Sequence, residues 1–388
     1  MAKRVVIVGG GSGGTILAND LDPHTYEVTV VSASASHMFQ PALLYVAMRG
    51  APAAIARDER GLLPSRVRFI QDAVAEVDLT AQTVMTAGGE RLPYDEVVLA
   101  TGILTDPGQI PGLAEVNAAI GDYHSTAAQA QKLWRQLDAF RGGTIALGQA
   151  SPVCKCPPSP LEGVLLAEEL IRRRGLRDKT RIVYFTPYPR AYPAKPMDEI
   201  VAPILAARGI EVMPFFDLDR IDPATRTLYS IEGDQIACDL PIVVPPFIGA
   251  DIAYRPAEVL DASRLVVTDR QSLRVKGVEH AFAIGDGTNL PTSKAGVGAH
   301  LEAKTVAAAL AGRPAVFEGR TNCPFDMGHG FGTFVVGSYT APVVKSPPTR
   351  WKHFMKMAFA RLYWLELRGW LDPVIDVYFR MTAPKPAP

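Results

Sequence analysis

The amino-acid sequence predicts an α/β protein with two Rossmann-like dinucleotide-binding domains and a C-terminal amphipathic helical region. The first domain is indicated by an apolar strand over residues 5–8 that runs into Gly9, Gly11 and Gly14. The second is indicated by another strand, loop and helix that begin near residue 144. The helical region is indicated by apolar residues at helical spacing after residue 350.

Composition narrows the class of protein. The chain has 388 residues, with 40 basic and 40 acidic side chains and a formal net charge of zero. A balanced charge provides no field to attract nucleic acid, so a nucleic-acid partner is not expected. The first four residues lead directly into the first strand, which leaves no room for a cleavable signal peptide. No apolar run approaches the roughly 20 residues of a membrane-spanning helix.

The first glycine motif reads G-x-G-x-x-G between a strand and a helix. Its three glycines permit a tight turn, a close approach of pyrophosphate to backbone N–H groups, and close packing of helix on strand. An acidic residue that binds a ribose hydroxyl is expected after the next strand, residues 27–31, but the chain has Ser32 and Ala33 there. The Ser32 hydroxyl can still make this hydrogen bond, more weakly than a carboxylate.

Three later segments fit a flavin nucleotide in the same domain. A buried strand ends in Thr101-Gly102, and another ends in Gly285-Asp286. Asp286 is placed to accept hydrogen bonds from a ribityl chain, although a lone Gly-Asp pair is also common in ordinary turns. Lys294 and Gly296 then open an alanine-rich helix to residue 310, whose N-terminus suits the negative charge of a reduced flavin ring. A solvated lysine before a helix is the alternative.

The second unit has cysteines where a second glycine motif would stand. After the strand at 144–147 only Gly148 follows, so no seat for NAD(P)H is predicted. Cys154 and Cys156 lie among prolines, where a thiol is expected to gain little burial, whereas Cys238 fits a buried packing role. Glu162 falls in the first turn of the following helix, where a carboxylate favours the dipole. No metal site is predicted, because zinc-type ligand spacing is lacking.

The C-terminal region is aromatic and basic. Four aromatic residues follow Cys323, and they are Phe325, Phe331, Phe334 and Tyr339. In the segment 350–371 the residues Trp351, Phe354, Met355, Ala358, Phe359 and Leu362 share one helical face, while Lys352, Lys356 and Arg361 fall elsewhere. Such a helix can pack on the protein's own body or lie in a membrane interface. Its tryptophans and arginines favour the membrane interface.

In this order the segments resemble the disulfide-containing flavoproteins that oxidise sulfide, above all the sulfide:quinone oxidoreductases. The resemblance covers about residues 1–340 and rests on four motifs, Cys156-Pro157-Pro158-Ser159-Pro160-Leu161-Glu162, Val244-Pro245-Pro246-Phe247, Ser293-Lys294-Ala295-Gly296 and Asn322-Cys323. It implies a glutathione-reductase-like fold with FAD, and sulfide and quinone as substrates. It also implies a redox disulfide between Cys156 and Cys323, with Glu162 beside the sulfur site as a proton carrier; its place in a helix first turn is the alternative explanation.

The same resemblance implies a set of cofactor and quinone contacts. The FAD-binding residues would be Gly9, Gly11, Gly14, Ser32, Ala33, Pro41, Thr101, Gly102, Gly285, Asp286, Lys294 and Gly296. The quinone would meet Phe325, Phe331, Phe334 and Tyr339. A membrane surface would meet the segment from Trp351 to Leu371, which makes the chain a peripheral protein of the cell membrane. The membrane face and the choice between monomer and homo-oligomer stay open.

The sequence departs from this family in three places. Many quinone-linked members carry a third cysteine, which is expected near residues 121–128, where this chain has Asp122, Tyr123 and His124. Cys154 could stand in for it. A family histidine after Thr186-Pro187 is also missing, and the chain leads only to Tyr192. The related flavocytochrome c sulfide dehydrogenase binds flavin through a cysteine near the position of residues 39–42, which is absent here, so the FAD is expected to be non-covalent.

The predicted domains are an FAD-binding domain over 1–107 and 240–312, a second Rossmann-like domain over 108–239, and a quinone and membrane region over 313–388. Three alternatives to a sulfide:quinone oxidoreductase stay open. They are a type II NADH:quinone dehydrogenase-like enzyme, a flavocytochrome c sulfide dehydrogenase-like flavoprotein, and a non-catalytic redox-sensing flavoprotein. The missing second glycine motif counts against the NADH enzyme.

Overall fold

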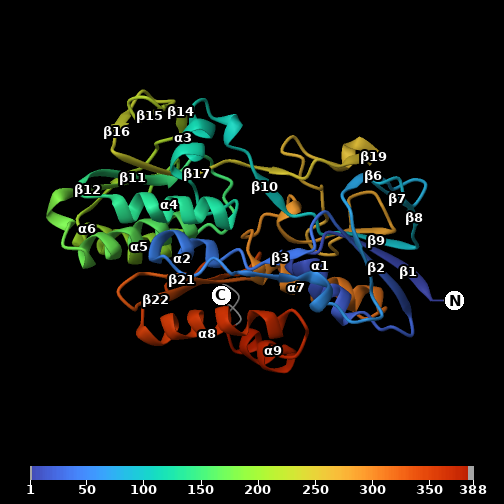
Figure 1. Ribbon diagram of the computed structural model, residues 1–388. Helices are drawn as coiled ribbons and strands as arrows, with labels where there is room; N and C mark the ends of the chain where they lie inside the picture. Colours follow the sequence, from blue (N-terminus) through green and yellow to red (C-terminus); the bar gives the residue numbers. More distant parts are fainter. Residues whose placement is uncertain (1, 383–388) are drawn as a thin grey trace.

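The computed structural model describes residues 2–382 and has the predicted α/β architecture, with two parallel sheets side by side (Figure 1). The first sheet has the strand order β20-β9-β1-β2-β5. Its strands are β1 (Lys3–Val8), β2 (Tyr26–Ser32), β5 (Arg68–Gln71), β9 (Glu96–Leu99) and β20 (Ala281–Ala283), and all pairs are parallel. The apolar run of β1 is buried on both faces, as in other parallel sheets covered on both sides.

Two layers cover the first sheet. Helices α1 (Ser12–Asp20) and α7 (Gly296–Leu310) pack together, and their apolar residues form a core with β1 and β2. A small sheet contributes to a second core that includes other residues of β1 and β9. This sheet has the order β19-β6-β7-β8, from β6 (Val74–Asp78), β7 (Thr83–Thr86), β8 (Arg91–Pro93) and β19 (Ala253–Arg255).

The second parallel sheet has the order β13-β12-β11-β17. Its strands are β11 (Gly143–Gln149), β12 (Thr180–Phe185), β13 (Ile210–Met213) and β17 (Leu240–Val244). The surrounding helices are α2 (Ala42–Arg49), α3 (Leu113–Ile120), α4 (Ala127–Ala139), α5 (Ser159–Arg173) and α6 (Lys195–Ala207). The prediction that the FAD-binding domain resumes at residue 240 is wrong for β17. This strand pairs in parallel with β11 and belongs to the second sheet.

Short antiparallel pairs connect and decorate these units. They are β10 (Ile103–Thr105) with β18 (Phe247–Gly249), β3 (Ser36–Met38) with β4 (Ala56–Asp58), and the sheet β14 (Leu218–Asp222), β15 (Thr227–Ser230) and β16 (Gln235–Ala237). Strand β10 follows β9 of the first sheet, and β18 follows β17 of the second sheet. The pairing of β10 with β18 therefore connects the two parallel sheets.

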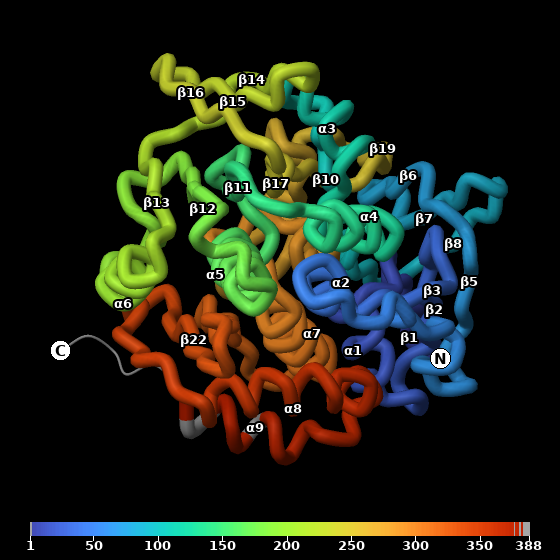
Figure 2. The backbone as a smooth tube through the Cα atoms, turned by 60° about the vertical axis from the view of Figure 1, so that its left-hand side comes forward, coloured from blue at the N-terminus to red at the C-terminus, as the bar shows by residue number. Residues whose placement is uncertain are grey.

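The C-terminal region is a hairpin followed by two helices. The hairpin is β21 (Thr321–Asp326) with β22 (Gly332–Gly337), and the helices are α8 (Arg350–Glu366) and α9 (Asp372–Met381). Figure 2 shows α8 and α9 along one edge of the molecule, next to β22 and α7. The predicted helix over 350–371 ends at Glu366, and Gly369 adopts a positive φ of 74° before α9. No helix within residues 2–382 has the length and apolar character needed to cross a membrane.

Candidate active site

The glycine motif closes the carboxyl end of β1 as predicted. A Cβ atom on Gly9 would lie 2.2 Å from the carbonyl oxygen of Ala100, and one on Gly14 would lie 2.1 Å from that of Gly9. Both positions therefore require glycine. Gly11 is the N-cap of α1 and has no atom within 4 Å of the position of a Cβ, which leaves open space before the helix N-terminus. Ser32 ends β2, and Ala33 follows it at the surface.

The two later loops of the first domain lie against each other. A Cβ atom on Gly287 would lie 2.7 Å from the hydroxyl of Thr101, so the Thr101-Gly102 loop touches the turn that holds Gly285 and Asp286. Gly102 and Gly296, like Gly11, face open space. These glycines and the backbone N–H groups at the start of α7 fit a flavin nucleotide that crosses the first domain. Pro41 is the N-cap of α2 and is exposed.

The two predicted redox cysteines are held by two consecutive residues. The backbone N–H of Cys156 donates to the carbonyl oxygen of Lys294 at 2.8 Å. The Ser293 hydroxyl lies 3.2 Å from the sulfur of Cys323, and the Thr321 hydroxyl lies 3.3 Å from it. Cys156 has a φ of 57°, a left-handed conformation that side-chain-bearing residues seldom adopt. Residues 293–294 thus bring both cysteines to the start of α7.

Burial dominates the acid–base properties of this site. It raises the pKa of the Cys156 thiol, and the nearby Glu162 and Cys323 raise it further. Burial also raises the pKa of Cys323, against the hydrogen bonds from Ser293 and Thr321. All four cysteines are free thiols in the structure.

Glu162 is a buried carboxylate in the first turn of α5. It accepts a hydrogen bond from the backbone N–H of Asp326 at 2.5 Å and forms an ion pair with Lys356. Burial raises the pKa of Glu162, while Lys356 opposes the shift. A buried, partnered carboxylate beside two thiols can carry a proton in and out of the site.

The buried Lys294 lies next to the turn that holds Gly285 and Asp286. Its ammonium donates to the carbonyl oxygen of Thr288 at 2.6 Å, and burial lowers its pKa. Asp286 lies 3.7 Å from the ammonium of Lys155, the residue between the two loop cysteines. The turn that holds Gly285 and Asp286 is therefore in contact with the loop that holds Cys154 and Cys156.

The expectation that Cys154 gains little burial is wrong. Its side chain lies in the apolar core of the second domain with 6% exposure, and its thiol donates to the carbonyl oxygen of Lys155. Burial raises the pKa of Cys154. Cys238 is buried as predicted, and burial raises its pKa to about 12.

The predicted quinone residues do not form one cluster. Phe325 is fully buried in the core of the second domain, on the same face of β21 as Cys323. Phe334 faces Tyr378 of α9 at a centroid distance of 6.4 Å. Phe331 is exposed beneath the guanidinium of Arg350, and Tyr339 packs edge-on against Phe317.

Sequence reasoning missed three residues near the sulfur atoms. The helical pattern places Lys356 off the apolar face together with Lys352 and Arg361, but in the structure it pairs with Glu162 inside the protein. The buried Tyr192 lies close enough to Cys323 and Cys156 for both thiols to raise the pKa of its phenol, after the effect of burial. Asp326 is fully buried next to Glu162. The one sequence signal for this site was a lysine within a largely apolar helix. A lysine that becomes buried requires a partner of opposite charge.

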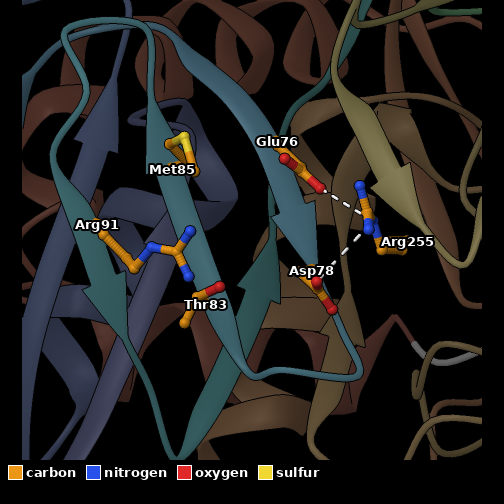
Figure 3. A pocket seen from close by; sticks show the side chains of 6 residues that line it. All are labelled: Glu76, Asp78, Thr83, Met85, Arg91 and Arg255. Carbon is orange, nitrogen blue, oxygen red and sulfur yellow. Dashed lines mark ion pairs between the residues drawn. The ribbon is translucent and has the colours of Figure 1, made fainter.

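A separate shallow pocket lies on the β19-β6-β7-β8 sheet, away from the cysteines (Figure 3). Glu76, Asp78, Thr83, Met85, Arg91 and Arg255 line it. The exposed Arg255 forms ion pairs with Glu76 at 3.2 Å and Asp78 at 3.9 Å. The pocket lining includes none of the predicted site residues.

Known proteins resemble this chain over most of its length. The chain is 27% identical to the mitochondrial sulfide:quinone oxidoreductase of Mus musculus, over 95% of this chain and 87% of that protein. It is 24% identical to the sulfide-quinone reductase of Aquifex aeolicus, over 98% and 96% of the two chains. The crystal structure of the Aquifex aeolicus sulfide:quinone oxidoreductase has the same fold, with a TM-score of 0.84 at 20% identity, over 98% of this chain and 95% of that one. The model of the pyridine nucleotide-disulphide oxidoreductases matches residues 3–312. The chain therefore belongs to the pyridine nucleotide-disulphide oxidoreductase family.

Proposed function

We propose that this chain is an FAD-dependent sulfide:quinone oxidoreductase, which oxidises hydrosulfide and transfers the electrons to quinone. The observation that carries the proposal is the meeting of Cys156 and Cys323 at residues 293–294, beside the buried Glu162. This site occupies the end of β11 where an NAD(P)H-binding motif would otherwise stand. The named relatives, which match most of this chain, support the same activity.

The FAD would be held by the first domain. Gly9, Gly11 and Gly14 would seat the pyrophosphate, and Asp286 would bind the ribityl chain. When bound, FAD would accept two electrons from the sulfur site and release them to quinone. The start of α7 would stabilise negative charge on the ring through its free N–H groups.

The sulfur step starts from a disulfide between Cys156 and Cys323. Hydrosulfide attacks the sulfur of Cys156, the S–S bond breaks, and Cys323 leaves as a thiolate that holds the electron pair. Cys156 then carries a persulfide, which keeps the proton of the hydrosulfide. The hydroxyls of Ser293 and Thr321, within 3.3 Å of the Cys323 sulfur, stabilise the thiolate by donating to it.

Glu162 manages protons at this site. Its raised pKa allows it to be protonated nearer neutral pH than an exposed carboxylate, and the ion pair with Lys356 stabilises its charged form. The two forms are therefore closer in free energy than for a surface glutamate, which suits a group that gives and takes a proton.

Helix α8 provides the surface for a membrane. Its exposed side chains include the apolar Trp351, Phe354 and Leu362, which are 65%, 56% and 40% exposed, together with the basic Arg350 and Arg361. Its polar Lys356 and Tyr363 face the protein instead, with Tyr363 bound to Ser12 and His37. A soluble helix has the opposite arrangement. We therefore assign the segment from Trp351 to Leu371 to the interface of the cell membrane, where quinone is available.

The aromatic hairpin is the proposed quinone end. Phe325 adjoins the face of Cys323, and Phe331 lies at the surface beneath α8. A quinone that leaves the bilayer at α8 would meet the exposed Phe331 first and then Phe334 on β22, whereas Tyr339 lies beyond this strand and packs against Phe317.

An NADH dehydrogenase is disfavoured by the second domain. A Cβ atom on Gly148 would lie 2.1 Å from the carbonyl oxygen of Phe185, so this glycine serves strand packing rather than a phosphate turn. The fold similarity to the type II NADH dehydrogenase of Plasmodium falciparum, with a TM-score of 0.72 at 13% identity, shows only the common architecture.

Anaerobic stopped-flow spectroscopy of the flavin tests the proposal. Micromolar sulfide is expected to bleach the flavin, and a short-chain quinone is expected to restore it. Bleaching by NADH but not by sulfide would identify an NADH dehydrogenase. Absence of bleaching by either reductant would point to a redox-sensing flavoprotein.

A further inference from the structure

A line of ionisable side chains connects the protein surface to the sulfur site. It begins at His353 of α8, whose side chain is 20% exposed. The Nδ1 atom of His353 lies 3.5 Å from a carboxylate oxygen of Asp326 and has no hydrogen-bond partner among the described residues. Asp326 is fully buried at the end of β21. A solvent-accessible imidazole thus meets a buried carboxylate.

The line continues from Asp326 to Glu162. The phenol of Tyr45 donates to Asp326 at 3.1 Å, and the backbone N–H of Asp326 donates to Glu162 at 2.5 Å. Burial raises the pKa of the Tyr45 phenol, and the carboxylates of Asp326 and Glu162 raise it further. The phenol therefore stays protonated and can pass a proton on instead of holding a negative charge.

We propose that His353 and Asp326 supply protons to the Glu162–Lys356 pair during turnover. The inference rests on the proposed function, because the proton balance of sulfide oxidation by quinone requires such a supply. Oxidation of one hydrosulfide by one quinone gives sulfane sulfur and quinol, and quinol needs two protons where hydrosulfide brings only one. One proton must enter the protein in each cycle, and this line leads from solvent to the site.

The transfer is a sequence of short steps. Solvent protonates the Nε2 atom of His353, and the Nδ1 proton passes to Asp326. The protonated Asp326 donates to the oxygen of Tyr45, and the phenol proton turns toward Glu162, whose carboxylate is near enough to raise the pKa of that phenol. His353 touches neither substrate, so it acts only through Glu162 and Lys356.

Several other charged groups face this line and would shift its pH dependence. They are Arg49 on α2 at 3.4 Å from Asp326, Glu169 on α5 bound to Arg49, and Lys352 on α8, which is bound to Ser346.

The test separates the two half-reactions in the flavin-loaded protein. In His353→Gln and His353→Ala, bleaching by sulfide is expected to keep its wild-type rate, while reoxidation by quinone slows by about tenfold, and more at higher pH. Added imidazole is expected to restore reoxidation in His353→Ala. Asp326→Asn is expected to slow the same step without imidazole rescue.

His329→Gln is the matched control. His329 lies on the same hairpin and is partly exposed, but it binds Glu168, which pairs with Arg172 rather than with Glu162. It is expected to leave both half-reactions unchanged. Wild-type reoxidation in both His353 variants from about pH 6 to 9 would overturn the inference. A wild-type protein that sulfide does not bleach would overturn the proposed function instead.

Discussion

Glu162 in the first turn of α5 is paired with Lys356 in the second turn of α8, although 194 residues separate them in the chain. The pair joins the sulfur site to the C-terminal helix, and Asp326 holds Glu162 from the hairpin between them. The same helix presents Trp351 and Phe354 to the outside. One helix thus closes the sulfur site on its inner face and offers an apolar surface on its outer face.

Removal of Lys356 alone is expected to destabilise the protein. Lys356→Met leaves the buried carboxylate of Glu162 without its cation, which costs about 3–5 kcal/mol for a buried pair. The free energy of unfolding is measured by urea titration of the flavin-loaded protein.

The double variant is the control for this interpretation. Glu162→Gln together with Lys356→Met removes both charges, so it is expected to be more stable than Lys356→Met alone. Equal stability of the single and double variants would mean that the unpaired charge of Glu162 is not what destabilises Lys356→Met.

The cysteines are expected to separate into two classes. Cys156→Ser and Cys323→Ser should each abolish bleaching of bound flavin by sulfide, because thiol–disulfide exchange needs both sulfur atoms. Flavin content, read from absorbance, should stay at the wild-type level. Cys238→Ala and Cys154→Ala should remain active, since both thiols are buried in the core. Near-normal quinone reduction in either serine variant would refute the proposed sulfur step.

The flavin is expected to leave the protein on acid denaturation. No cysteine lies in residues 38–44, so no thiol is available there for a bond to the ring. After precipitation with acid, the flavin absorbance should be in the supernatant. Flavin that stays in the pellet would indicate a covalent bond through another residue.

The buried Glu302 should give stability a specific pH dependence. Its carboxylate accepts from the backbone N–H of Gly285 at 2.5 Å, and burial raises its pKa from 4.5 to about 7. The folded state therefore binds the proton more tightly than the unfolded state. This contribution to stability is full below the unfolded pKa and is lost as pH rises through about 7, a change of about 3 kcal/mol.

Glu302→Gln removes this titration. Relative to the wild type, the variant should be more stable at about pH 8 than at about pH 5 by most of that amount, measured by urea unfolding of the flavin-loaded protein. Glu318→Gln, at an exposed carboxylate paired with Arg320, is the control. A difference that does not change with pH would show that Glu302 keeps an ordinary affinity for protons.

The sequence correctly predicted those strands, helices and turns that depend only on neighbouring residues. The glycine motif, the strand Leu240–Val244 and the helix that ends at Leu310 follow from apolar runs and glycine spacing, and the structure contains them. The burial of Cys154 and the pair between Glu162 and Lys356 could not be predicted, because both depend on how distant segments pack. The apolar pattern of α8 predicted the helix, but it could not show that Phe359 packs against Tyr378 while Trp351 and Phe354 stay exposed.

Membrane binding is the most direct measurement that tests the exposed apolar side chains of the C-terminal region. Trp351, Phe354, Leu362 and Trp370 are 65%, 56%, 40% and 67% exposed. Burying about half of these side chains in the interface contributes on the order of 4 kcal/mol. The fourfold replacement of these residues by serine is therefore expected to weaken binding to anionic liposomes by about 1,000-fold. It should also slow turnover with long-chain quinone.

The matched control uses exposed apolar residues elsewhere. Leu104→Ser with Phe215→Ser removes side chains that are 56% and 58% exposed on other parts of the surface, and should leave liposome binding unchanged. Bleaching by sulfide should be normal in both variants, because the inner face of α8, with Lys356 and Tyr363, is intact. If the fourfold variant binds liposomes like the wild type, the outer face of α8 serves another contact and the membrane assignment is wrong. If it loses flavin, these residues support the fold instead.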